Sequence, residues 1–443
     1  MKRILSLTAA ATLMVAPESR AQHVPAIRQL GPVVATSNET FGTQVFVRHA
    51  KNGVLVNDVQ NRRLLLFDPM LSTFTVVADT TPATANAYSG RFGGLIAYHA
   101  DSSLFVDAQS MSMLVIDPEG KVARVMSVPR SQDAVALGNP NLGNPSLDGR
   151  GRLVYRGMPR PIMPPPSRDG SFTPPQPPDS VPLVAVNLTS RQVDTVGWTL
   201  VPKLKMNIQR DDNGRVMIQA VANPLPLVDD WAVLSDGSIA LVRGRDYHID
   251  WVRPDGSRES TPKIPFEWKR LTDEDKVVFM DSVKAARERM AAANAAAPGA
   301  TTMVVGGGGG ADATRQRPAR EGMEVIVGGG RGGPGGAGGP GGAGPMGASA
   351  LNMIPPSELP DYQPPFFVGQ MRADADGRLW IRTIPTKGIA GGPVYDVINS
   401  KGELVERVQV PKDRVIVGFG AGGVVYLVAR DGNTTRLEKA TFK

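Results

Sequence analysis

The chain of 443 residues contains no cysteine. This absence excludes disulfide bridges, thiolate metal ligands, iron–sulfur clusters and cysteine nucleophiles. A domain without such cross-links must be held together by a large apolar core, which a chain of this length can build. Apolar residues make up 41% and charged residues 21% of the sequence, which is the balance of a globular protein.

Other chemical features are also scarce. Only four histidines occur, and no two of them have the spacing of metal ligands. No run of lysine and arginine suggests a contact with nucleic acid, although the net charge is +7. A Gly-x-Ser-x-Gly motif is absent, which removes one common signature of a serine nucleophile. We therefore predict no catalytic motif, no metal site, no cofactor and no nucleic-acid partner.

The first residues resemble a secretion signal. Lys2 and Arg3 precede an uncharged stretch over residues 4–15, and a small-x-small site ends at Ala21. A transmembrane helix would need about 20 apolar residues, which no segment provides. We expect residues 1–21 to be a signal peptide and residues 22–443 to form a periplasmic or secreted protein.

Short runs of alternating apolar and polar residues recur along the chain, separated by Asp-Gly, Asn-Gly or Gly-rich turns. Such alternation is typical of half-buried strands, and these turn residues favour hairpins. Residues 43–79 contain four such runs: TQVFVRH, GVLVND, RLLLFDP and TFTVVAD. A second copy begins at residue 94, and weaker copies begin near residues 146, 230, 371 and 415.

The residue that ends the second strand of each unit gives the repeat length. These residues are Asn57, Asp107, Arg156, Arg243, Arg382 and Ala429, with gaps of 50, 49, 87, 139 and 47. Four strands in a period of about 40–50 residues indicate propeller blades. We predict an all-β fold, a six-bladed β-propeller, and the two long gaps indicate insertions.

The blade pattern resembles six-bladed propellers of the NHL-repeat and TolB-like kind. The segments that carry the resemblance are LLLFDP (64–69), MLVIDPEGK (113–121) and HIDWVRPDGS (248–257). The resemblance covers about two-thirds of the chain and implies closure of the ring by terminal strands. The last unit has a weak fourth strand, so residues 24–34 are expected to supply one from the N-terminus.

Three insertions interrupt the blades. Residues 158–182 contain ten prolines and are predicted to form a surface loop. Residues 267–298 are predicted to be helical, with a capping box at Thr272 and an apolar stripe that includes Val277 and Met280. Residues 299–366 are rich in glycine and proline and are expected to be disordered. A hairpin over 203–221 is expected to complete or extend the third blade.

The second-strand ends suggest a ligand site. Repeat-equivalent residues face the same end of a propeller, so Arg156, Arg243 and Arg382 should line one arc. Arginine offers a planar fork that binds carboxylate or phosphate. The predicted ligand-binding residues are Arg156, Arg243, Arg245, Arg382, Asp107 and Asn57. The alternative is that strand ends are simply solvated positions for arginine.

These observations favour a non-enzymatic binding or protein-interaction propeller, a monomer whose partner is an anionic small molecule or a protein. One alternative is a metal-dependent hydrolase, lactonase or lyase. The resemblance implies for such an enzyme a metal held by Glu, Asn and Asp, and the first strands here offer only Asp148, Asn144, Asp236 and Asp374. A metal shared by His49 and His99 is a further alternative, and a structural role in an envelope assembly is the last.

Overall fold

A computed structural model of the chain describes most of the repeat units. The described residues are 24–42, 44–81, 88–89, 93–139, 142–158, 178–203, 205–210, 216–296, 325–327, 352–388, 390–431 and 434–442. The predicted signal peptide lies outside these residues, as does most of the proline-rich and glycine-rich insertions. No helix in the described ranges is long and apolar enough to cross a membrane.

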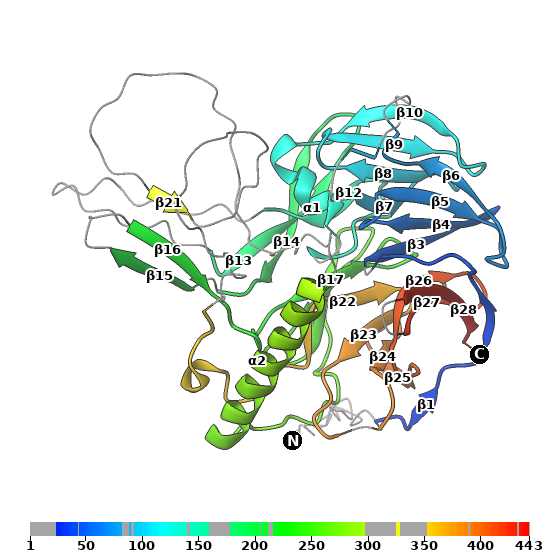
Figure 1. Cartoon of the computed structure of the whole chain (residues 1–443). Helices are drawn as coiled ribbons and strands as arrows, with labels where there is room; N and C mark the ends of the chain where they lie inside the picture. The colour runs from blue at the N-terminus through cyan, green and yellow to red at the C-terminus, as the bar shows by residue number, and fades with distance from the viewer. Residues whose placement is uncertain are drawn as a thin grey trace, which may run out of the picture.

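The six repeat units form six blades arranged around a central channel (Figure 1). Blade 1 consists of β3 (Val45–Ala50), β4 (Gly53–Asp58), β5 (Arg63–Phe67) and β6 (Phe74–Ala78). Blade 2 consists of β7 (Gly93–Ala97), β8 (Ser103–Asp107), β9 (Ser112–Ile116) and β10 (Val122–Ser127). Blade 3 consists of β11 (Ser146–Leu147), β12 (Leu153–Arg156), β13 (Ser180–Val186) and β14 (Val193–Leu200).

The other three blades follow the same antiparallel order. Blade 4 consists of β17 (Asp230–Val233), β18 (Ile239–Arg243), β19 (His248–Val252) and β20 (Arg258–Ser260). Blade 5 consists of β22 (Phe366–Ala373), β23 (Leu379–Thr383), β24 (Val394–Ile398) and β25 (Leu404–Gln409). Blade 6 contains β26 (Arg414–Gly420), β27 (Val424–Asp431) and β28 (Thr434–Thr441). The predicted six-bladed propeller is therefore confirmed.

The N-terminal segment completes the ring, but the strand that closes blade 6 begins near the end of the predicted range 24–34. β2 (Val33–Thr36) pairs antiparallel with β28 and supplies the outermost strand of blade 6. β1 (Ile27–Gln29) pairs parallel with β25 and adds a fifth strand to blade 5. On the inner side of the ring, β26 of the last blade lies beside β3 of the first.

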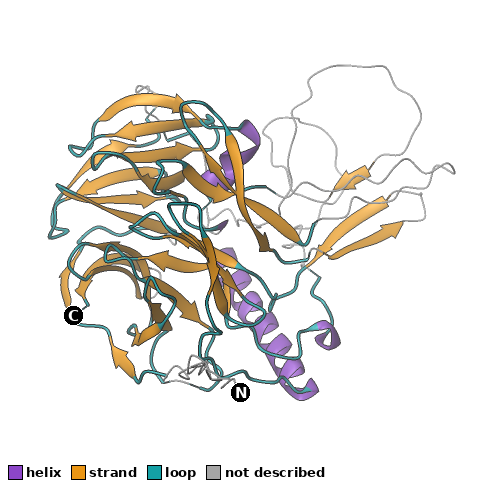
Figure 2. Ribbon diagram, turned by 180° about the vertical axis from the view of Figure 1, so that it is seen from behind, coloured by secondary structure: helices purple, strands orange, loops and turns teal. Residues whose placement is uncertain are grey.

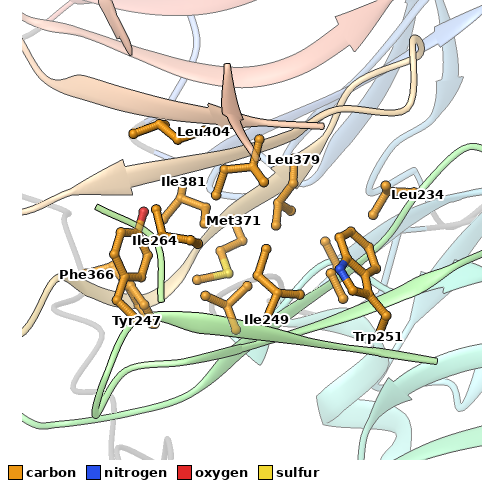
Figure 3. Packing of buried hydrophobic residues seen from close by; sticks show 14 of the residues in the cluster. Leu234, Tyr247, Ile249, Trp251, Ile264, Phe366, Met371, Leu379, Ile381 and Leu404 are labelled. Carbon is orange, nitrogen blue, oxygen red and sulfur yellow. The ribbon is translucent and has the colours of Figure 1, made fainter. Parts of the chain in front are cut away.

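The core is divided among the blade interfaces. Six clusters of buried apolar side chains each join two neighbouring blades. Figure 3 shows the cluster between blades 4 and 5, where Trp251 and Ile249 face Met371 and Leu379. This division follows from the strand alternation, because both faces of each blade need a cover.

The second insertion folds outside the ring. The helix α2 (Asp273–Ala296) begins with the predicted capping box, in which Thr272 Oγ1 accepts from the Asp275 N–H and Asp275 Oδ2 accepts from the Thr272 N–H. Met280 packs on Leu271, Ile354 and Leu359. Val277, predicted to lie on the buried stripe, is 47% exposed because Lys276 and Met280 face the protein instead.

Two predicted boundaries differ from the structure. Residues 352–366 were assigned to the disordered insertion, but they are described and contain the buried Ile354 and Leu359. β13 begins at Ser180, inside the predicted proline-rich loop of 158–182.

The predicted hairpin forms β15 (Lys205–Arg210) and β16 (Val216–Val221), which join β21 (Val325–Val327) in a separate sheet. It does not extend blade 3, because β14 already closes that blade. Figures 1 and 2 show this sheet and α2 outside the ring, on one side of it. A short helix α1 (Ala134–Gly138) between blades 2 and 3 was not predicted.

Candidate functional site: the channel cavity

A cavity of about 320 Å³ lies in the central channel. The first strand of every blade contributes to its wall, and α1 adds Leu137. Gly94 allows this close approach, because a Cβ atom there would lie 2.2 Å from the Leu137 carbonyl oxygen. We call this space the channel cavity; its polar walls come mainly from Arg48, His49, Asn144, Arg372 and Asp374.

Arg48 enters the channel cavity from β3. Its Nη1 donates to Ser103 Oγ at 2.7 Å and to the Asp101 carbonyl oxygen at 3.3 Å, both in blade 2. The buried Nε atom has no hydrogen-bond partner in the part of the chain that the structure describes. Burial lowers the pKa of Arg48, and the attraction of Asp101 opposes this only in part. No carboxylate in the described residues lies within 4.0 Å of this guanidinium.

Arg372 enters the same cavity from β22. Its Nη1 donates to Asn144 Oδ1 at 3.0 Å, and Asn144 Nδ2 donates to the Met371 carbonyl oxygen at 2.7 Å. Asn144 therefore connects the start of blade 3 with blade 5 across the channel. Burial lowers the pKa of Arg372, and the described part of the chain places no ion-pair partner within 4.0 Å of it.

Asp374 is the one carboxylate among the described residues of the cavity wall. Its Oδ2 accepts from Arg378 Nε at 2.8 Å and from Trp380 Nε1 at 2.9 Å. Its Oδ1 accepts from the backbone N–H groups of Asp376 and Arg378. Because Arg378 balances this carboxylate, the charge left without a close partner in the channel cavity is positive.

His49 also faces the channel cavity, and its Nδ1 lies 2.9 Å from the hydroxyl of Tyr426 in β27. Burial, Lys439 and Arg48 hold the pKa of His49 below its ordinary value, which is about 6.5. The imidazole is therefore neutral at pH 7. Burial raises the pKa of Tyr426 to about 12, so its hydroxyl keeps its proton. The described residues give His49 Nε2 no hydrogen-bond partner.

The described residues do not fit a divalent metal. They contain no group of three or more His, Asp or Glu side chains that could hold one. Asp148 and Asp236 accept hydrogen bonds within their own hairpin turns, from Arg152 and Ser238 respectively. His49 contacts Tyr426, whereas the ring of His99 packs on Tyr98.

The predicted arginine arc lies on a network of acids. Arg156, 4% exposed, donates to the Asp229 carbonyl oxygen at 3.1 Å, and its Nη2 lies 3.7 Å from Asp230 Oδ1. Arg243 donates to Asp229 Oδ2 at 2.8 Å and to Asp250 Oδ2 at 2.7 Å. Asp230 Oδ2 accepts from the Gln370 N–H. Blades 3, 4 and 5 are therefore joined here. Carboxylates occupy the fork of Arg243, whereas Arg156 bonds to a backbone carbonyl and has Asp230 as its nearby counter-charge.

The remaining predicted residues divide into two groups. Asn57 and Asp107 are buried. Asn57 donates to the Gly93 carbonyl oxygen, and Asp107 accepts from the Ser89 N–H, both near the start of blade 2. The structure gives these two a role in joining blades or fixing a turn. Arg382 bonds to Gln370 Oε1 at 3.5 Å, and Arg245 is exposed. A ligand role for these two arginines stays a prediction.

Sequence reasoning missed Arg48 and Arg372 because it followed the ends of second strands. Both residues lie in first strands, in the segments VFVRH and MRADADG. First strands line the channel of a propeller, so a search for charged residues in those segments would have found both.

No protein-family model and no curated protein matches this chain. Solved structures do match. One is virginiamycin B lyase of Staphylococcus aureus, with 10% identity, a TM-score of 0.38, and coverage of 93% of this chain and 99% of that chain. A gluconolactonase of Xanthomonas campestris has 12% identity, a TM-score of 0.26 and coverage of 94% and 99%. Regucalcin, a calcium-binding protein of Agrobacterium tumefaciens, has 10% identity, a TM-score of 0.32 and coverage of 94% and 98%.

These comparisons correct the functional prediction. The lyase and the gluconolactonase are enzymes, so the interpretation as a non-enzymatic binding module is wrong and its enzymatic alternative is favoured. Identities of this size concern the fold alone, and TM-scores this low carry no argument about substrate. The chain is similar to six-bladed propellers of the lyase and gluconolactonase kind; the narrower NHL-repeat or TolB-like kinship is not confirmed.

Proposed function

We propose that this chain is an enzyme of the hydrolase or lyase class that uses His49 for proton transfer in the channel cavity. The observation that carries the proposal is the His49–Tyr426 pair at the cavity wall, with an Nδ1 to hydroxyl distance of 2.9 Å. A histidine that is neutral at pH 7 and held by one ring nitrogen is suited to general acid–base chemistry with the other.

The hydroxyl of Tyr426 fixes the orientation of the imidazole, and Nε2 is the nitrogen left to exchange a proton with a substrate. Hydrolysis and elimination both build negative charge on oxygen as the reaction proceeds. Donors aimed at that charge stabilise the transition state, and in a partly dry site they act strongly. Arg48 and Arg372 are such donors in the same cavity.

A metal-dependent version of this chemistry is not proposed, because the described residues contain no group of three or more His, Asp or Glu side chains that could hold a metal ion. Three narrower features belong to the proposal. Export to the periplasm or the exterior is supported by residues 1–21. An NHL-repeat or TolB-like kinship is supported by the segments LLLFDP and MLVIDPEGK. The third feature of the proposal is that the protein acts as a monomer.

The test is an activity screen with matched histidine variants. Purified protein would be assayed against aldonolactones, aryl esters and carboxylates with a leaving group β to the carboxyl group. For any substrate turned over, His49→Ala should lower kcat by about 10²–10⁴-fold, the usual contribution of general acid–base catalysis. His99→Ala is the control, because His99 lies in the neighbouring hairpin but outside the cavity wall.

The proposal fails if His49→Ala and His99→Ala have equal kcat values on every substrate that the wild type converts. It also fails if no member of the panel is converted at a rate above that of the His49→Ala protein.

A further inference from the structure

The arginines of the channel cavity differ from most other described arginines that are not exposed. Ten of those have an acidic side chain within 4.0 Å, whereas Arg62 and Arg382, outside the cavity, have none in the described part of the chain; the ten are Arg28, Arg63, Arg130, Arg152, Arg156, Arg243, Arg253, Arg378, Arg407 and Arg414. Arg48 and Arg372 have none in the described residues, although both are partly buried. The carboxylates whose attraction raises the pKa values of these two arginines are those of Asp101 and Asp230, and both lie beyond that distance.

A guanidinium removed from water needs both a counter-charge and acceptors for its five N–H groups. Among the described residues, Arg48 is held in place through Nη1, and none of them offers an acceptor to its buried Nε. Arg372 is likewise held by Nη1, through Asn144. In both residues Nη1 positions the group, and Nη2, to which the described residues give no hydrogen bond, is the nitrogen left for a ligand.

The two arginines come from blades 1 and 5 and line one cavity. Its volume of about 320 Å³ is at the lower end of the range for small-molecule sites. The sole described carboxylate of the wall, Asp374, is balanced by Arg378. The cavity therefore combines small size with uncompensated positive charge.

Resting on the proposed function, we infer that the substrate is a small oxyanion, a carboxylate or a phosphate ester, whose charged group is bound by Arg48 and Arg372. Arginine suits both chemistries because its fork donates two parallel hydrogen bonds to two oxygens. His49 shares the cavity wall with them, so the reacting part of the substrate lies next to the anion-binding end.

The test measures binding by calorimetry at fixed ionic strength with three probes: malonate, inorganic phosphate and the neutral malonamide. Malonate or phosphate should bind and malonamide should not, and the better of the two anions identifies the oxyanion. Arg372→Gln should weaken binding of that anion by about tenfold or more, which corresponds to about 1.4 kcal/mol. Arg48→Gln should act in the same direction.

Arg124→Gln is the matched control, because Arg124 lies in the outermost strand of blade 2, bonds to Tyr98 and does not line the cavity. Its affinity should equal that of the wild type. If Arg372→Gln does not fold, Arg372→Lys keeps the charge but lacks the fork, and it should still weaken binding.

Equal binding of malonamide and malonate overturns the inference, and so does an unchanged dissociation constant in both cavity variants. The inference and the proposed function can fail separately. If anion binding survives in His49→Ala but no substrate is turned over, the anion-binding inference stands and the proposed enzymatic function is refuted. If neutral substrates are turned over and neither malonate nor phosphate inhibits the reaction, the enzymatic function stands and the anion-binding inference is refuted.

Discussion

The buried pair of Arg156 and Asp230 gives the sharpest test of how the blades are joined. Arg156→Met would remove the guanidinium but keep a long apolar side chain in its place. Asp230 is 0% exposed, and Arg156 Nη2 is the cation next to its Oδ1, at 3.7 Å. Removing one partner of a buried pair costs about 3–5 kcal/mol, because the other charge is left uncompensated.

The pH dependence identifies the charge that is left behind. Burial raises the pKa of Asp230 to about 6, and Arg156 opposes this shift; an unfolded aspartate titrates near 3.9. A folded-state pKa above the unfolded value means that protonation stabilises the fold, and that this stability is lost as the pH rises through the folded pKa. Without Arg156 the pKa rises further, so the cost of Arg156→Met should be larger at pH 7.5 than at pH 5.

The assay is urea unfolding followed by tryptophan fluorescence at both pH values. Arg124→Met is the control, because Arg124 is exposed in the outermost strand of blade 2, and it should stay within about 0.5 kcal/mol of the wild type, as surface substitutions usually do. A cost below about 1 kcal/mol for Arg156→Met, or a cost that is the same at both pH values, would refute the assignment of a buried ion pair.

Four further outcomes are expected. Trp380 and Leu241 are each 1% exposed at a blade interface. Replacing either with Ala should lower the free energy of unfolding, measured by urea titration, by about 2–5 kcal/mol. Costs below about 1 kcal/mol at both sites would mean that the interfaces are misassigned. The partly exposed Trp268 is the comparison, and its change to Ala should cost less. Thr272→Ala should lower stability by about 1 kcal/mol through loss of the α2 cap, measured by thermal melting against Ser282→Ala, which leaves the capping box of α2 intact. For any substrate found, kcat/KM should fall on the acid side with a midpoint below about 6.5, because the pKa of His49 is lowered; a midpoint above that value in the pH profile argues against His49. Tyr426→Phe should lower kcat more than it changes KM, because Tyr426 positions His49 rather than binding substrate, and an unchanged kcat would contradict this.

The strands and the ring were predictable because period-2 alternation and turn residues are local signals. Asp236 and Asp255 belong to Asp-Gly turns of the kind that separates the predicted strands, and each accepts hydrogen bonds from a serine two residues later. The capping box at Thr272 depends on two residues three positions apart, and it was also visible in the sequence.

The ends of the second strands did not predict the candidate site. The alignment of second-strand ends placed Arg156 and Arg243 at one end of the ring, but Asp229 and Asp230 come from a loop and strand that the repeat did not align with them. Whether an arginine is neutralised depends on such contacts between blades. The exposure of Val277 has a similar origin, because the docked face of α2 is set by Ile354 and Leu359, far along the chain.

The pairing of β2 with β28 also determines the order in which the protein can fold. Ser37 and Leu437, which bond beside this pair, are 400 residues apart. Closing a flexible loop of that length costs about 5 kcal/mol of chain entropy, and contacts so distant in sequence form late. β2 must wait unpaired until β28 is made. A chain interrupted before residue 434 would therefore leave β2 without a partner and expose the edge of β27 in blade 6, a ready template for aggregation.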